Sequence, residues 1–190
     1  MRNAREMKAA NRLRVLRLLR RGPSSRSDLA ASTGLTRAAM SLIIGELIEQ
    51  GLVSEAGRRD SRSGRRPVLV ELRPDYAYSL ALTIARSRAE AGVADFTGRL
   101  VSRVPIDLEG VKLNAALARI RKTLTQLTAA PRRWLGLGIS TPGPVDTSSG
   151  TILNPPHFDL WHNVRLCDAL GGIGIEHCFL ENNAQALTTA

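Results

Sequence analysis

The pattern of apolar and polar positions in residues 1–73 predicts three helices followed by two strands. The short apolar runs at residues 52–55 and 68–72 have the length of strands. A first helix is expected over about residues 4–20, with an apolar stripe formed by Leu13, Val15, Leu16, Leu18 and Leu19.

Two further helices are expected on either side of a glycine turn. Ser25 is placed to cap the first of them, and Gly34 follows it where a left-handed backbone would be costly for other residues. Thr36 can cap the next helix, over about residues 37–50. The buried face of that helix is expected to hold Met40, Ile43, Ile44, Leu47 and Ile48. This order of elements is typical of a winged helix-turn-helix.

Candidate contacts to DNA lie at the start of the third helix and between the two strands. Small and polar residues let a helix approach base edges, and an arginine can reach guanine or phosphate. An arginine-rich hairpin, or wing, can enter a minor groove or clamp phosphates. The residues expected to contact DNA are Thr36, Arg37, Ala38, Ser41, Arg58, Arg59, Arg62, Arg65 and Arg66.

Charge divides the chain at the same point. Residues 1–73 hold 16 Lys/Arg and 7 Asp/Glu, a net charge of +9, whereas residues 74–190 hold 11 and 10, a net charge of +1. Such asymmetry favours a nucleic-acid-binding module joined to a near-neutral domain. We therefore predict a DNA-binding domain at residues 1–73 and a second domain at residues 74–190.

The two cysteines, Cys167 and Cys178, form no CxxC pair and suggest neither a disulfide framework nor a zinc site. The histidines have no metal-ligand spacing, and we expect no metal and no cofactor. No apolar run approaches the roughly 20 residues of a membrane span, and the N-terminus lacks the apolar run of a signal peptide. These features predict a cytoplasmic protein, associated with the nucleoid and not with a membrane.

The second half predicts an α/β domain. A helical pattern spans about residues 113–127. Strands are expected at residues 78–84, 89–95, 100–106, 134–140 and 178–181.

Four motifs give the chain a resemblance to the ROK family of repressors, uncharacterised reading frames and sugar kinases. They are Gly64-Arg65-Arg66-Pro67-Val68 after the winged helix, the segment from Gly138 to Asp146, Ile152-Leu153-Asn154-Pro155-Pro156 with Trp161, and Glu181-Asn182-Asn183-Ala184. The resemblance covers essentially all 190 residues. It implies an actin-like, ribonuclease-H-like α/β lobe that helps to bind a sugar between two lobes. Because the family continues with a second lobe after these motifs, the lobe expected here is incomplete.

Two departures from the family pattern argue against a kinase. The Asp-x-Gly-x-Thr phosphate loop of family kinases is replaced by Thr83-Ile84-Ala85-Arg86-Ser87. The aspartate that the resemblance implies as base on the sugar hydroxyl is Asn183 here, and a neutral amide cannot take a proton. We therefore expect no catalytic residue and no enzyme activity.

Gly143, Asn182 and Asn183 correspond to a sugar site by the same resemblance. A structural interpretation stands beside it: the asparagines can cap the following helix, and Pro142-Gly143-Pro144 can turn the chain. Both remain open at this point.

The sequence thus predicts a sequence-specific DNA-binding transcriptional regulator, a repressor of carbohydrate genes that responds to a sugar. The expected partners are a double-stranded DNA operator with two half-sites, a small sugar or sugar-phosphate effector, and a second copy of the chain. The alternatives are an ATP-dependent sugar kinase of ROK type and a regulator without effector binding.

Overall fold

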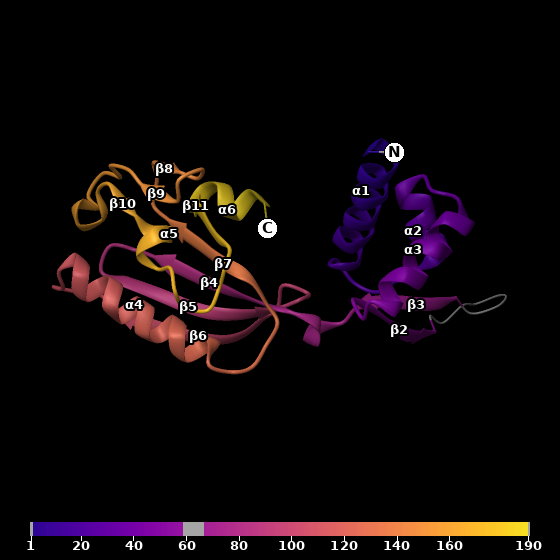
Figure 1. The fold of residues 1–190 in the computed structure, drawn as a ribbon, viewed down its shortest axis with the longest axis horizontal. Helices are drawn as coiled ribbons and strands as arrows, with labels where there is room; N and C mark the ends of the chain where they lie inside the picture. Colours follow the sequence, from indigo (N-terminus) through magenta and orange to yellow (C-terminus); the bar gives the residue numbers. More distant parts are fainter. Residues whose placement is uncertain (1, 59–66, 190) are drawn as a thin grey trace. The chain divides into compact units, whose positions relative to one another are not determined.

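The computed structural model describes residues 2–58 and 67–189, which fold as two compact units (Figure 1). One unit runs from the N-terminus to Tyr76 and includes the turn Phe96–Gly98; the other comprises Ala77–Asp95 and the chain from Arg99 onward. The overall fold is mixed α/β, as predicted.

The first unit contains the predicted three helices and two strands. The helices are α1 (Arg2–Leu19), α2 (Arg26–Thr33) and α3 (Arg37–Glu49), and the strands are β2 (Val53–Arg58) and β3 (Val68–Leu72). A further strand, β1 (Ser24–Ser25), pairs antiparallel with β3, so the sheet order is β1-β3-β2. The sequence did not predict β1, because two polar residues carry no strand pattern of their own.

The helices of this unit pack around one apolar core. It includes Val15 and Leu19 of α1, as expected, whereas Leu13 of the predicted stripe is 49% exposed. The other buried members are Leu29, Ala30, Met40, Ile43, Ile44, Leu47, Val53, Val70 and Leu72.

The second unit is built on a five-stranded sheet of order β11-β7-β4-β5-β6. Strands β4 to β6 form an antiparallel meander, β7 runs parallel to β4, and β11 runs parallel to β7. The strands are β4 (Tyr78–Ile84), β5 (Arg88–Asp95), β6 (Leu100–Asp107), β7 (Trp134–Thr141) and β11 (Cys178–Asn182). Each matches a predicted strand.

Smaller elements complete the second unit. The predicted helix is α4 (Leu113–Thr128), and α5 (Leu166–Ala169) and α6 (Asn183–Thr189) flank β11 in the sequence. A separate sheet of order β10-β9-β8, not predicted, consists of β8 (Val145–Asp146), β9 (Thr151–Ile152) and β10 (Val164–Arg165). Two short 3-10 helices, η1 (Pro74–Tyr76) and η2 (Asp159–Trp161), lie in connecting segments.

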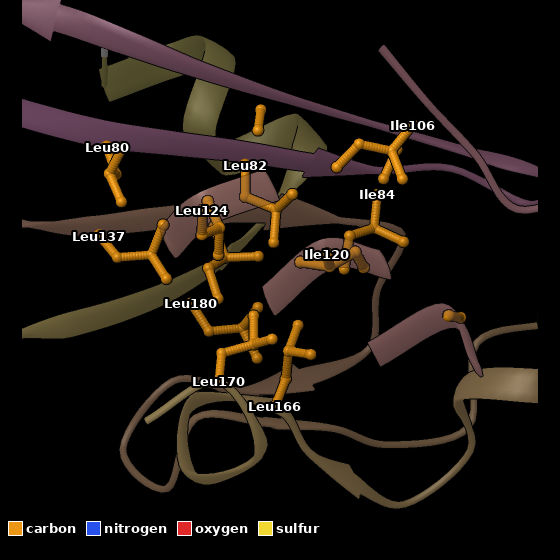
Figure 2. Packing of buried hydrophobic residues seen from close by; sticks show 14 of the residues in the cluster. Leu80, Leu82, Ile84, Ile106, Ile120, Leu124, Leu137, Leu166, Leu170 and Leu180 are labelled. Atoms are coloured by element: carbon orange, nitrogen blue, oxygen red, sulfur yellow. The ribbon is translucent and has the colours of Figure 1, made fainter. Parts of the chain in front are cut away.

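Helix α4 covers one face of the sheet with a narrow apolar stripe. Ala116, Ile120 and Leu124 recur every four residues and are fully buried, which is the period of a helix face. Figure 2 shows Ile120 and Leu124 among sheet residues such as Leu82, with Leu166 and Leu170 closing the cluster near Leu180. This core fixes the strands whose ends carry the second candidate site.

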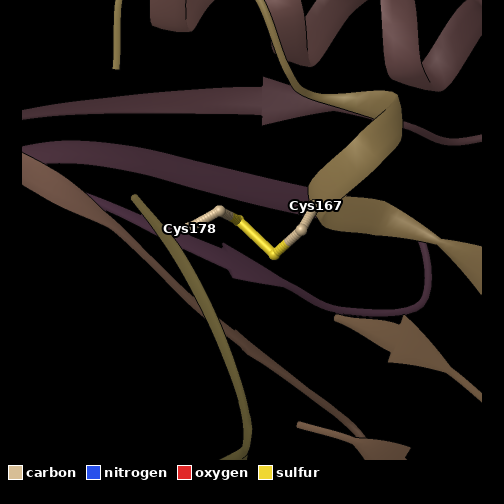
Figure 3. Close-up of a disulfide and its surroundings, with 2 residues drawn as sticks. All are labelled: Cys167 and Cys178. Atoms are coloured by element: carbon tan, nitrogen blue, oxygen red, sulfur yellow. A yellow bond between two sulfur atoms is a disulfide. The ribbon is translucent and has the colours of Figure 1, made fainter. Parts of the chain in front are cut away.

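The two cysteines form a disulfide, which corrects the expectation that they would not pair. Cys167 lies in α5 and Cys178 begins β11, with Cα atoms 5.7 Å apart (Figure 3). The backbone N–H of Cys167 donates to the carbonyl of Gly150 at 3.2 Å, which holds α5 in place. The sequence carries no signal for this bond, because an 11-residue separation brings two residues together only through the tertiary fold.

Candidate DNA interface and candidate sugar site

The helix-turn-helix is defined by local caps. The Ser25 hydroxyl accepts a hydrogen bond from the N–H of Asp28 at 3.1 Å at the start of α2, and Gly34 ends α2 with φ of 72°. The Thr36 hydroxyl accepts from the N–H of Ala39 at 3.2 Å at the start of α3. Gly51, with φ of 74°, follows α3. The caps at Ser25 and Thr36 and the turn at Gly34 agree with those predicted from the sequence.

Burial of one face of α3 leaves its opposite face exposed. Met40, Ile43, Ile44 and Leu47 are buried in the core, and the predicted contact residues Thr36, Arg37, Ala38 and Ser41 are all exposed. Within the described residues, the Arg37 guanidinium has no hydrogen-bond or ion-pair partner. The structure therefore brings these four residues together on one exposed surface, where Arg37 can extend toward a ligand.

Several other basic side chains of the first unit are engaged within it. Lys8 contacts Glu46 at 2.6 Å, and Arg14 donates to the carbonyls of Thr33 and Ser32 at 3.0 and 3.1 Å. These contacts join α1 to α2 and α3. Lys8 and Arg14 add to the positive charge of the first unit, but their contacts hold α1 against α2 and α3.

The wing hairpin is described only at its base. Arg58, predicted to lie between the strands, is the last residue of β2 and pairs with Val68. The register shifts between Glu55 and Arg58, where Gly57 has φ of 93°. The other predicted wing residues, Arg59, Arg62, Arg65 and Arg66, lie outside the described residues.

The predicted sugar-binding residues meet at the carboxyl ends of two parallel strands. Asn182 at the end of β11 pairs with Thr141 at the end of β7. A Cβ atom on Gly143 would lie 3.1 Å from the Cβ of Asn182, so these two residues are in close contact. Asn183 follows directly and hydrogen-bonds the hydroxyl of Ser140 through its side-chain oxygen.

Asn182 also has the structural role considered in the sequence analysis. Its side-chain oxygen accepts a hydrogen bond from the N–H of Gln185 at 2.9 Å, which caps α6. Its amide nitrogen donates to Gln185 Oε1 at 2.8 Å. Thr141 beside it is fully buried, and its hydroxyl has no hydrogen-bond partner among the described residues. The strand ends thus gather amide and hydroxyl groups, the types of group that bind sugar hydroxyls.

The positions of the family's phosphate loop lie on the neighbouring strand. Thr83 of β4 pairs with Ser140 of β7 in parallel register. Thr83 and Ala85 line an open pocket, in which Arg103 and Glu90 form an ion pair at 2.6 Å. Neither Thr83 nor Ala85 supplies the carboxylate or the glycine of a phosphate loop.

The loop between β8 and β9 is organised by Asp146. Its carboxylate accepts hydrogen bonds from the hydroxyls of Ser148 and Ser149 at 2.7 and 2.6 Å and from the Ser148 N–H at 3.0 Å. These hydrogen bonds, the Ser148 hydroxyl first, lower the pKa of Asp146 to about 2. Asp146 therefore acts as a turn-forming residue downstream of Gly143.

Metal and membrane features can be stated for residues 2–58 and 67–189. No three His, Cys, Asp or Glu side chains there come together in a way that could hold a metal ion. In the same ranges, no helix has both the length and the apolar character to cross a membrane.

A winged helix with an exposed, capped third helix, joined to an α/β lobe, defines the class of this protein: a winged-helix protein with an appended α/β domain. The MarR family model matches residues 7–66. The chain is 30% identical over 166 residues to the xylose repressor of Caldicellulosiruptor bescii, an alignment that covers 84% of this chain and 41% of that protein. It is 25% identical to the DNA-binding transcriptional dual regulator NagC of Escherichia coli K12, covering 97% of this chain and 46% of that protein.

A solved structure gives the same result for the fold. The crystal structure of a ROK family transcriptional regulator, a homologue of the Escherichia coli MLC protein, superposes with a TM-score of 0.69 and 26% identity, covering 96% of this chain and 47% of that one. The chain is similar in sequence to these regulators and in fold to a ROK family transcriptional regulator, and it spans less than half the length of these relatives.

Proposed function

We propose that this chain is a sequence-specific DNA-binding regulator that represses carbohydrate genes and responds to a sugar. Residues 1–73 would bind the operator, and residues 74–190 would contribute to the effector site. The observation that carries the proposal is the exposed start of α3, with Thr36, Arg37, Ala38 and Ser41 on one face of a strongly basic unit. Similarity to a xylose repressor and to NagC across both units supports it.

Binding to DNA is tested by selecting genomic fragments with the full chain and titrating the best one at several salt concentrations. With about five phosphate contacts, log affinity should fall against log salt with a slope near −4 to −5. A fragment-independent affinity, or an affinity unaffected by salt, would remove the basis of the proposal.

Arg37 should read bases, whereas the wing arginines should clamp phosphates. Arg37→Ala is expected to cost about 1–3 kcal/mol on the preferred site and to relax its sequence preference. Substitutions of Arg65 and Arg66 should weaken all sites more evenly, unless the wing enters a narrow minor groove. Arg88→Ala removes an exposed arginine of the second unit and is the charge-matched control, with little expected effect.

For the effector we propose contact with sugar hydroxyls by Gly143, Asn182 and Asn183. Their meeting at two strand ends, beside the buried hydroxyl of Thr141, supports this assignment. Calorimetric titration with D-xylose, N-acetylglucosamine and their phosphates tests it. Asn183→Ala should abolish the heat of binding, and Asn114→Ala, at an exposed position of α4, should leave it unchanged. Absence of binding by the unmodified chain would favour a regulator without an effector.

A sugar kinase is the second candidate, and the residues argue against it. Phosphoryl transfer requires positioned phosphates, a held metal ion and a base near the acceptor hydroxyl. Thr83 and Ala85 replace the phosphate loop, and Asn183 replaces the base. Phosphate transfer from ATP to hexoses above background, lost on substitution of Asn182, would restore the kinase hypothesis.

A homodimer on a two-half-site operator, located at the nucleoid in the cytoplasm, completes the proposal. Sedimentation of the chain with and without operator DNA measures the stoichiometry. Two chains per operator and a pseudo-palindromic selected site are the expected results.

A further inference from the structure

Leu42 is an apolar side chain at an unusual place on α3. It is 65% exposed, although the helix buries four other large apolar residues in the core. It follows Ala38 by four residues, so it lies next to this proposed DNA contact on the exposed side of α3. Among the described residues, Leu42 is not part of the apolar core of the first unit.

The neighbours of Leu42 on α3 are mostly small, so its side chain projects beyond them. Its neighbours at three and four residues are Ala38, Ala39, Gly45 and Glu46. A Cβ atom added to Gly45 would meet nothing within 4 Å. The Glu46 carboxylate is held by Lys8 at 2.6 Å and approached by Arg12 at 4.0 Å, both on α1. The side chains one helical turn from Leu42 therefore place neither bulk nor an uncompensated carboxylate beside it.

The major groove offers one apolar feature to such a side chain. Base edges there carry hydrogen-bond donors and acceptors, and thymine alone adds a C5-methyl group. A leucine cannot satisfy a donor or an acceptor, so it favours contact with methyl groups over the polar edges of G·C pairs.

We propose that Leu42 is a specificity-determining residue that packs against thymine methyl groups in the major groove of the operator. The inference rests on the proposed function, in which α3 enters that groove. Because Leu42 is five residues after Arg37, about 7.5 Å farther along the axis of α3, the thymine should lie in the same half-site as the base contacted by Arg37.

The test removes methyl groups one at a time from the DNA. Each thymine of the selected operator is replaced by deoxyuridine, and the affinity of the full chain is measured by fluorescence anisotropy. One or two replacements in each half-site should weaken binding about three- to five-fold, the loss expected for one buried methyl group. With Leu42→Ala, the same replacements should have no effect, whereas Leu42→Met should retain the sensitivity.

Two controls separate a base contact from other roles. Leu135→Ala changes an exposed leucine of the second unit and should keep the uracil effect. Thermal unfolding of Leu42→Ala should match the unmodified chain, because an exposed leucine contributes little to the core.

Each other outcome overturns the inference in a distinguishable way. If no DNA fragment is bound, the proposed function fails and Leu42 with it. If the chain binds its operator but uracil has no effect, or has the same effect with Leu42→Ala, the operator proposal stands and the role of Leu42 is wrong. If Leu42→Ala instead changes the mass of the free protein in sedimentation, Leu42 contacts a second copy of the chain.

Discussion

The two units build their candidate sites in different ways. In the first unit, the candidate contacts come from α3 and its N-cap; they are Thr36, Arg37, Ala38 and Ser41. They are exposed because the opposite face of α3 is buried, with Met40, Ile43, Ile44 and Leu47 in the core. In the second, Gly143 and Asn182 come from different strand ends and meet only because β7 and β11 are parallel neighbours. A site on one helix depends on local periodicity, whereas a site between strands depends on the whole sheet.

The units also differ in what holds them together. The first joins α1 to its other helices through an apolar core and surface contacts such as that of Lys8 with Glu46. The second has a larger core and a disulfide that links α5 to β11. Perturbations of one unit should therefore leave the other unchanged, and the following experiments test that difference.

The largest effect is expected from core truncation in each unit. Leu47 and Leu124 are both fully buried, and Leu→Ala at such a site costs about 2–5 kcal/mol. Both tryptophans, Trp134 and Trp161, lie in the second unit, so their fluorescence during urea denaturation follows that unit alone. Leu124→Ala should shift this transition and Leu47→Ala should not. Equal shifts would mean that the chain unfolds as one domain.

Reduction of the disulfide should come next in size. Closing a loop of this length stabilises by about 3 kcal/mol in the chain-entropy account. Dithiothreitol should therefore lower the free energy of unfolding of the second unit, while amide exchange in α3 stays the same.

The control for this experiment is the Cys167→Ser/Cys178→Ser double variant, which should be insensitive to reductant. Thiol titration of the native, unreduced chain should find no reactive cysteine; two reactive thiols would contradict the disulfide.

Two glycines of the first unit should respond in opposite directions. Gly34→Ala forces a side chain into a left-handed conformation and should destabilise by about 1–2 kcal/mol. Gly45→Ala lies in a helix with open space around the new Cβ and should stabilise by about 0.5–1 kcal/mol. The rate of amide hydrogen exchange in α3 measures the change in stability of both variants. Stabilisation by Gly34→Ala would mean that its backbone conformation does not require glycine, and destabilisation by Gly45→Ala would mean that the helix does not accommodate the new methyl group.

The smallest effect should be the pH dependence from Asp146. Its pKa is lowered from 3.8 to about 2, so its contribution to stability is fully present above about pH 4 and is lost as the pH falls through 2. The difference in unfolding free energy between the unmodified chain and Asp146→Asn should shrink across that window. Because Asp146 is only partly buried, a small change is expected. A difference independent of pH would show that the Ser148 and Ser149 hydrogen bonds do not favour the ionised form.

The sequence alone determined the elements whose formation depends on near neighbours. The caps at Ser25 and Thr36 and the turn at Gly34 are set by contacts three or four residues away and by one backbone conformation. The buried face of α3 follows from the helical period, and the family motifs allowed the α/β lobe to be predicted. These features need no knowledge of what lies opposite them.

Only the tertiary structure decided which distant residues meet. It paired Cys167 with Cys178, added β1 to the edge of β3, turned Lys8 toward Glu46, and placed Gly143 against Asn182 while Asn182 capped α6. It also left Leu42 exposed on a helix otherwise packed with apolar residues. Each of these outcomes depends on how strands and helices far apart in the sequence are arranged. The pattern of polar and apolar residues is compatible with many arrangements of these elements, and the packing of the core selects one of them.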